Sequence, residues 1–239
     1  MSLSKNHIKL ITSLGQKKYR QNHKLFVVEG VKVVKEFLNS SFELHQLFST
    51  DNSFAHLPAS ILIEEHELKK ISKLKTPNRV LAIFKIPEPK KIEFTGLILA
   101  LDAINDPGNL GTMIRLCDWF GVSQMICSKD TVDCYNRKVV QASMGSLTRV
   151  SLHYVELESF LSNTDLPIFT ADMNGENVYK TNLPNEGVLI MGNEANGISD
   201  AVKSLSTHEL TIPRFGDIQQ TESLNVATAT AILLSEFRR

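Results

Sequence analysis

The 239-residue sequence contains few cysteines, and its histidines show no metal-binding spacing. Cys117, Cys127 and Cys134 form no CxxC pair and are odd in number, which predicts reduced, buried thiols and excludes a disulfide framework. None of the seven histidines belongs to an HxH or HExxH motif, so we expect no structural or catalytic zinc and assign no metal ligands.

Long apolar runs are also missing. No stretch approaches the roughly 18 residues that a membrane span requires. Residues 1–14 lack the continuous apolar core of a signal peptide. We therefore expect a cytoplasmic protein without membrane segments. With 42% hydrophobic and 22% charged residues, the composition is typical of a globular protein with one large domain or two small ones.

The charges are unevenly distributed along the chain. The formal net charge is zero, yet residues 1–35 hold eight Lys or Arg residues and one acid, Glu29. This excess favours a basic face that binds a polyanion such as RNA, although a solvated face of an amphipathic helix would explain the same charges. The candidate RNA-binding residues are Lys17, Lys18, Arg20 and Lys24.

A proline-containing seam divides the chain. Pro87 and Pro89 interrupt the apolar pattern, which predicts an N-terminal domain over 1–86, a linker over 87–92 and a C-terminal domain over 93–239. Short strands and helices alternate in the first domain, as expected of a small α/β sandwich. The expected helices span 4–14, 31–38 and 64–74, and the expected strands 25–28, 46–49, 61–63 and 80–85.

Strand-like and helix-like runs also alternate in the C-terminal domain. This alternation predicts a mainly parallel sheet covered on both faces, with ligands bound at the carboxyl ends of the strands. The expected strands span 96–101, 123–127, 150–154, 167–171, 187–191 and 209–212, and the expected helices 111–120, 135–147, 156–162 and 223–236.

The first of three distinctive segments, residues 105–115, follows a predicted strand. Pro107-Gly108 predicts a turn, and we expect Asn109 to cap the next helix. Arg115 lies about a turn and a half later, where it could reach back over the strand ends toward an anion. A structural turn followed by a surface arginine is the alternative interpretation.

The second and third segments also follow predicted strands. In residues 188–199, Gly192 and Gly197 have GxxxxG spacing without the Lys-Ser/Thr of a phosphate loop, and GxGxxG is absent. Glycines let the backbone approach a ligand closely, which suits adenosine recognition. The third segment comprises 210–213 and 223–231, where Ser223 is expected to cap a helix of small residues, and simple core packing is the alternative for that helix.

Together, and in this order, the three segments resemble the signature blocks of the SpoU (TrmH-like) branch of the SPOUT methyltransferases. The resemblance covers 93–239, including the small-residue stretch Gln141–Ser146, and residues 1–86 resemble more loosely the substrate-recognition domain that precedes this catalytic domain. It implies an α/β knot in which the last helix threads through a loop. It also implies a homodimer that binds S-adenosylmethionine in the knot, near the dimer interface.

The resemblance further implies methylation of a ribose 2′-hydroxyl in structured RNA, with ribosomal RNA favoured over transfer RNA. We expect Arg115 to stabilise developing negative charge, because a guanidinium stays protonated and makes a poor base. The segment between Pro213 and Ser223 is longer than the family pattern. The implied catalytic residues are Asn109, Arg115, Glu194, Ser223 and Asn225, and the implied cofactor-binding residues are Met191, Gly192, Asn193, Gly197, Ile212, Pro213 and Leu224.

Three alternatives remain open. The same fold could methylate a base nitrogen, although Asn109 and Arg115 are placed as in the ribose-modifying branch. A catalytically silent RNA-binding homologue would fail to bind the cofactor, and its polar positions would not need to be intact. A nicotinamide-dependent enzyme is disfavoured by the missing GxGxxG.

Overall fold

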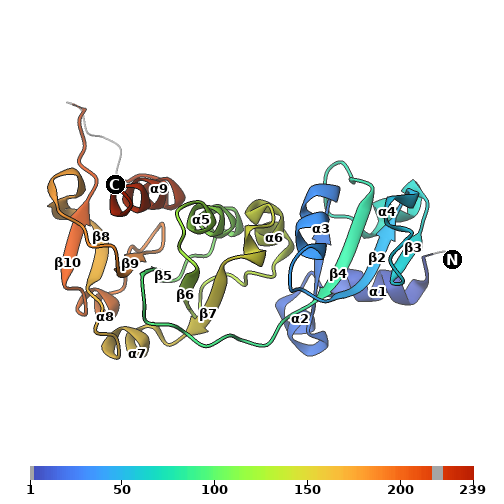
Figure 1. Ribbon diagram of the computed structural model, residues 1–239, viewed down its shortest axis with the longest axis horizontal. Coiled ribbons are helices and arrows are strands. Elements are labelled where there is room, and N and C mark those ends of the chain that lie inside the picture. The colour runs from blue at the N-terminus through green and yellow to red at the C-terminus, as the bar shows by residue number, and fades with distance from the viewer. Residues whose placement is uncertain (1–2, 217–222) are drawn as a thin grey trace. The chain divides into compact units, whose positions relative to one another are not determined.

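The computed structural model describes residues 3–216 and 223–239, which form two compact units (Figure 1). Unit 1 comprises residues 1–89 and 133–148, and unit 2 comprises residues 90–132 and 149–239. The chain first passes from unit 1 to unit 2 close to the predicted linker. The sequence prediction placed residues 133–148 in the C-terminal domain, whereas the structure packs them in unit 1.

Unit 1 is built on a four-stranded mixed sheet. Its strand order is β1 (Leu25–Glu29), β4 (Val80–Lys85), β2 (Leu44–Ser49) and β3 (Ser60–Leu62), and only the β2–β3 pair is parallel. Side chains alternate across β1 because successive residues of a strand point to opposite faces. Leu25 and Val27 join a core cluster with Ile11, whereas the Phe26 ring contacts Phe37 on the other face.

Helices cover both faces of this sheet, as expected of an α/β sandwich. On one face, residues of α1 and α4 belong to the core cluster that contains Val27. On the other face, α3 supplies Phe37, whose ring centroid lies 5.3 Å from that of Phe84 on β4. The helices of this N-terminal segment are α1 (Lys5–Ser13), α2 (Lys17–His23), α3 (Val31–Leu38), the short η1 (Asn52–Phe54) and α4 (Glu65–Ile71).

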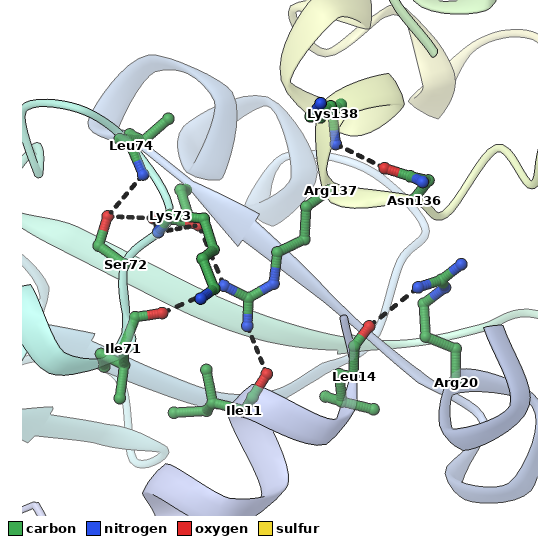
Figure 2. Close-up of polar contacts among 11 residues, drawn as sticks. Ile11, Leu14, Arg20, Ile71, Ser72, Lys73, Leu74, Asn136, Arg137 and Lys138 are labelled. Atoms are coloured by element: carbon green, nitrogen blue, oxygen red, sulfur yellow. Dashed lines mark hydrogen bonds and ion pairs between the residues drawn. The ribbon is translucent and has the colours of Figure 1, made fainter. Parts of the chain in front are cut away.

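Buried polar contacts explain why residues 133–148 pack in unit 1. This segment contains α6 (Arg137–Ser143) and η2 (Ser146–Thr148). The buried guanidinium of Arg137 donates to the carbonyls of Ile11 and Ile71, near the ends of α1 and α4 (Figure 2). Arg137 also pairs with Glu29, 3.4 Å away, and the Tyr135 ring lies against Phe26 with centroids 4.7 Å apart. Apolar periodicity alone could not predict these contacts, since they depend on buried charges.

Unit 2 contains a six-stranded sheet in which every pair is parallel. Its strand order is β10-β8-β9-β5-β6-β7, so the α/β class and mainly parallel sheet predicted from the sequence are confirmed. The strands are β5 (Leu97–Leu101), β6 (Gln124–Ser128), β7 (Ser151–Val155), β8 (Ile168–Asn177), β9 (Gly187–Met191) and β10 (His208–Thr211).

Helices flank this sheet on two sides (Figure 1). On one side, α5 (Pro107–Trp119) lies beside α9 (Val226–Phe237), and the Arg238 guanidinium donates to the Phe120 carbonyl at 2.9 Å. On the other side, α7 (Leu157–Ser162) and α8 (Asp200–Lys203) pack against sheet residues such as Ile98 and Ile190. The short η3 (Val178–Lys180) follows β8.

Two helices begin at different residues from those predicted. Asp106, rather than Asn109, caps α5 by accepting a hydrogen bond from the Asn109 backbone N–H at 2.8 Å. Asn225, rather than Ser223, caps α9, and α9 begins at Val226. In α5, the proline that follows Asp106 fits the first helical position, so the helix begins earlier than predicted. In α9, the Asn225 side chain stands directly before the helix and caps it. The side chains of Asn109 and Ser223 are therefore left for other contacts.

Cys117, Cys127 and Cys134 are free and buried, as predicted, and burial raises the pKa of the Cys117 and Cys127 thiols. Within residues 3–216 and 223–239, no helix combines the length and apolar character that spanning a bilayer would need. The predicted knot depends on the path of residues 217–222, which lie outside the described part of the chain.

Candidate active site

The first two sequence motifs start side by side at the centre of the unit 2 sheet. Strands β5 and β9 pair in parallel, with Leu101 opposite Met191 at their carboxyl ends. The Asp102 backbone N–H extends this pairing by donating to the Met191 carbonyl at 2.9 Å. The loops that follow both strands therefore leave the sheet at the same edge, where ligands of parallel α/β sheets bind.

Side-chain hydrogen bonds hold these two loops together. The Asp102 carboxylate accepts from the Ser199 backbone N–H at 2.8 Å, and the Asn193 side-chain amide donates to the Ala103 carbonyl at 2.7 Å. Sequence analysis missed Asp102, although a carboxylate directly after a fully buried strand could have indicated it. Both contacts cross from one motif to the other, so the loops form one structural element.

The second loop folds tightly back on itself, which requires glycine at its start. Asn193 and Gly197 exchange two backbone hydrogen bonds of 2.9 Å. A Cβ atom on Gly192 would lie only 2.4 Å from the backbone carbon of Gly197 and the nitrogen of Ile198. The Asn193 carboxamide oxygen also accepts from the backbone of Ala195 at 2.9 Å. This compact loop presents Glu194 on its outer side, where the side chain is exposed.

Three of the predicted catalytic side chains form a continuous chain of hydrogen bonds. The Asn225 amide nitrogen donates to the Asn109 amide oxygen at 3.0 Å. The Asn109 amide nitrogen in turn donates to a Glu194 carboxylate oxygen at 2.5 Å. One residue comes from each of the three motifs, so the structure brings together positions that are up to 116 residues apart in sequence.

The start of α9 sets the direction of this chain of hydrogen bonds. The Asn225 side-chain oxygen accepts from the backbone N–H groups of Ala227 and Thr228, at 3.0 and 3.2 Å. Its NH2 group must therefore face Asn109, which presents its own oxygen there and its NH2 group to Glu194. Asn109 is thus oriented by the helix on one side and by a carboxylate on the other.

The remaining two predicted catalytic residues are exposed and stand outside this network. Arg115 lies on α5, and Ser223 lies two residues before the capping Asn225. Neither side chain forms a hydrogen bond or ion pair with another residue of the described ranges 3–216 and 223–239. An exposed guanidinium that has no partner among the described residues is available to bind an anionic ligand.

The predicted cofactor-binding residues lie at the ends of β9 and β10 and just before α9. Met191 is buried, Ile212 and Pro213 are half-buried, and Leu224 is 48% exposed. Strand β8 lies between β10 and β9, and its Met173 side chain is 62% exposed. Exposed apolar side chains beside free strand ends fit a ligand with an apolar ring system and hydrogen-bonding edges, such as adenosine.

A small pocket of about 350 Å³ lies at the carboxyl ends of β5, β6 and β9. Its lining includes Asp102, Asp130, Glu156 and Glu158, which makes it unfavourable for phosphate, and its Lys129 is already paired with Glu156. Among the described residues, no group of three or more His, Cys, Asp or Glu side chains is arranged to hold a metal ion.

The predicted RNA-binding residues of unit 1 fall into two classes. Lys17, Lys18 and Lys24 are exposed. Arg20, by contrast, is only 2% exposed, and the prediction that it contacts RNA is wrong. Its guanidinium pairs with Asp133, with Nη2 2.5 Å from the carboxylate. It also donates to the Leu14 carbonyl at 3.0 Å, a contact drawn in Figure 2. Arg20 thus completes the packing of residues 133–148.

Known proteins resemble this chain over its full length. Residues 96–235 match the SpoU rRNA Methylase family, and residues 5–82 match the MRM3-like substrate binding domain. The 23S rRNA (guanosine(2553)-2′-O)-methyltransferase RlmP of Bacillus subtilis is 30% identical, and the alignment covers 94% of this chain and 93% of RlmP.

Two solved structures have the same fold throughout. One, from Porphyromonas gingivalis and assigned to the TrmH family of RNA methyltransferases, has a TM-score of 0.90 and 37% identity over 99% of this chain and 98% of that one. The other, an AdoMet-bound rRNA methyltransferase from Sinorhizobium meliloti, has a TM-score of 0.88 and 27% identity over 100% of this chain and 97% of that one.

Proposed function

Because the chain belongs to the SpoU rRNA Methylase family, we propose that it transfers a methyl group from S-adenosylmethionine to a ribose 2′-hydroxyl of ribosomal RNA. The observation that carries this proposal is the hydrogen-bonded chain Glu194–Asn109–Asn225 at the carboxyl ends of the central strands. The Bacillus subtilis relative is named for 2′-O-methylation of 23S rRNA, and the Sinorhizobium meliloti structure contains AdoMet. These names favour ribosomal over transfer RNA.

The cofactor would supply an electrophilic methyl group on a sulfonium. Residues at the ends of β9 and β10, with Leu224, would hold its adenosine through backbone groups and apolar contacts. The tight loop around Gly192 and Gly197 would keep these backbone groups in a fixed geometry. Since methyl transfer is an in-line displacement, fixed placement of donor and acceptor contributes much of the rate.

Arg115 would act on the RNA. The attacking 2′-oxygen gains negative charge as it loses its proton, and a guanidinium held nearby stabilises that charge. Because arginine remains protonated at any physiological pH, it serves better as this electrostatic partner than as the base. Its planar fork can also hold a neighbouring phosphate through two hydrogen bonds.

The amide network would position the acceptor. Asn109 has both ends of its amide engaged, so it presents a rigid edge to the ribose. Glu194 would fix Asn109 and the loop that carries it, and Ser223 would contact the ribose beside Asn225.

We also propose that the protein acts as a cytoplasmic homodimer. The 84% exposed Trp119 on α5 supports a dimer, because a large exposed aromatic side chain is a common interface anchor.

The proposal is tested by incubating the protein and tritiated S-adenosylmethionine with ribosomal RNA or transfer RNA from a strain that lacks the enzyme. We expect tritium to enter ribosomal RNA, and the Arg115→Ala variant to transfer it about 100-fold more slowly or worse. If only transfer RNA is labelled, transfer RNA and not ribosomal RNA is the substrate. Absence of labelling in every RNA, with cofactor binding also absent, would identify a silent RNA-binding homologue.

A further inference from the structure

A groove of about 580 Å³ lies between α1 and α2 of unit 1. This volume falls within the range of roughly 300–1,000 Å³ found for small-molecule binding sites. Its lining mixes polar and aromatic side chains that the catalytic proposal does not use. They include Asn6, Lys9, Ser13, Gln16, Tyr19 and His23.

The spacing of these residues shows that each helix turns one face toward the groove. Residues 6, 9 and 13 of α1 recur at helical spacing, as do residues 16, 19 and 23 at and within α2. The Tyr19 and His23 rings are nearly parallel, with an interplanar angle of 18° and centroids 6.5 Å apart. Tyr19 remains 39% exposed, so one aromatic surface is open to a ligand.

The charges around the groove have one sign. No Asp or Glu occurs before Glu29, whereas Lys9, Lys17, Lys18 and Lys24 are all exposed on or beside α1 and α2. The remaining cation of α2, Arg20, points into unit 1 and is neutralised by Asp133. The exposed face of α1 and α2, which contains the groove, therefore carries an excess of positive charge.

We propose that this groove binds unpaired nucleotides of RNA, with a base stacked on Tyr19 and the backbone phosphates held by Lys9 and the lysines of α2. This inference rests on the proposed function, which makes RNA the substrate. Stacking on an aromatic ring requires a base that is not already stacked in a duplex, so the groove favours single-stranded loops. The exposed lysines on and beside α1 and α2, with no acidic residue before Glu29 in the sequence, favour a polyanion over a protein partner.

The test uses a fluorescein-labelled, unstructured 12-nucleotide RNA and a duplex RNA of equal length, titrated with the full-length protein at several salt concentrations. Tyr19→Ala should weaken single-strand binding about 5- to 150-fold, the loss expected for one base stack, whereas Tyr19→Phe should keep it. Lys9→Gln should lower the logarithmic salt slope by roughly 0.7, the value for one single-strand phosphate.

Two matched variants serve as controls, because they change similar side chains on other elements. Leu62→Ala removes an exposed apolar side chain from β3, and Lys69→Gln removes an exposed charge from α4. Neither should change the affinity or the salt slope. The proposal is overturned if Tyr19→Ala binds the single strand within twofold of wild type, or if the controls lose as much affinity as the groove variants.

The same protein samples separate this inference from the proposed function. Stabilisation by S-adenosylmethionine in a thermal melt reports unit 2 chemistry and does not require the groove. If wild type shows no such stabilisation yet Tyr19→Ala still loses RNA affinity, the groove stands and the methyltransferase proposal fails. The converse result leaves the methyltransferase proposal intact and overturns the groove.

Discussion

Replacing Arg20 separates a structural role from an RNA-binding one. The guanidinium is 2% exposed and makes three contacts, two with Asp133 and one with the Leu14 carbonyl. In Arg20→Ala, the Asp133 carboxylate loses its partner while it remains largely buried, at 14% exposure. Breaking a buried ion pair in this way typically costs about 3–5 kcal/mol of folding free energy.

The assay is urea unfolding, followed by far-UV circular dichroism and by fluorescence. The single tryptophan, Trp119, belongs to unit 2, so its fluorescence follows that unit while circular dichroism follows both. We expect Arg20→Ala to move the circular dichroism transition to lower urea. The double change Arg20→Met with Asp133→Leu should recover much of the loss, because an apolar pair can replace a buried ion pair.

Lys18→Ala is the matched control, since Lys18 lies on the same helix and is exposed. It should change the unfolding free energy by less than about 0.5 kcal/mol, as is usual for a surface residue. Our account of Arg20 is refuted if Arg20→Ala unfolds at the same urea concentration as wild type and instead loses RNA affinity as Lys18→Ala does.

Three further predictions concern unit 2. Arg115→Ala should lower the methyl-transfer rate by about 100-fold or more while leaving cofactor affinity unchanged. Arg115→Lys should lose a similar factor in rate, because an ammonium lacks the planar fork. An Arg115→Ala variant that keeps a third of the wild-type rate would contradict this role. Gly192→Ala should abolish cofactor binding in calorimetric titration, because its Cβ would lie 2.4 Å from backbone atoms. A Cβ on Gly216 would meet no atom of the described residues within 4 Å, so Gly216→Ala should bind the cofactor normally. Excess cofactor should stabilise the protein, by about 2.7 kcal/mol at a hundredfold excess over the dissociation constant, and an unchanged melting temperature would count against a cofactor site.

The strand and helix order of unit 2 could be predicted because the apolar runs are long and regularly interrupted. Buried strands such as β5 and β9 contain only apolar residues and glycine, and a helical pattern intervenes between most of them. The family resemblance drawn from the three motifs is confirmed by the match over residues 96–235. The order of the strands within the sheet could not be predicted, because hydrophobic periodicity does not show which strands pair with one another.

Other features depend on particular side chains and could not be predicted. Helix α2 buries an arginine, Arg20, on its inner face. A sequence of lysines and one arginine is normally typical of an exposed helix, so the sequence alone predicted that all of these cations were exposed. Likewise, residues 133–148 pack in unit 1 through Arg137 and Arg20, both of which read as ordinary surface cations in sequence. The sequence prediction treated Pro107-Gly108 as a turn and therefore placed the helix cap at Asn109. In the structure both residues belong to the first turn of α5, and Asp106 is the cap.

The chemical identity of the methylated product tests the central claim most directly. RNA labelled by the enzyme with tritiated S-adenosylmethionine is hydrolysed in alkali, which requires a free 2′-hydroxyl next to each cleaved phosphate. A 2′-O-methylated nucleotide therefore resists cleavage, and the account predicts that tritium is recovered in an alkali-resistant dinucleotide from ribosomal RNA. Recovery of the tritium in single nucleotides would place the methyl group on a base and contradict ribose methylation.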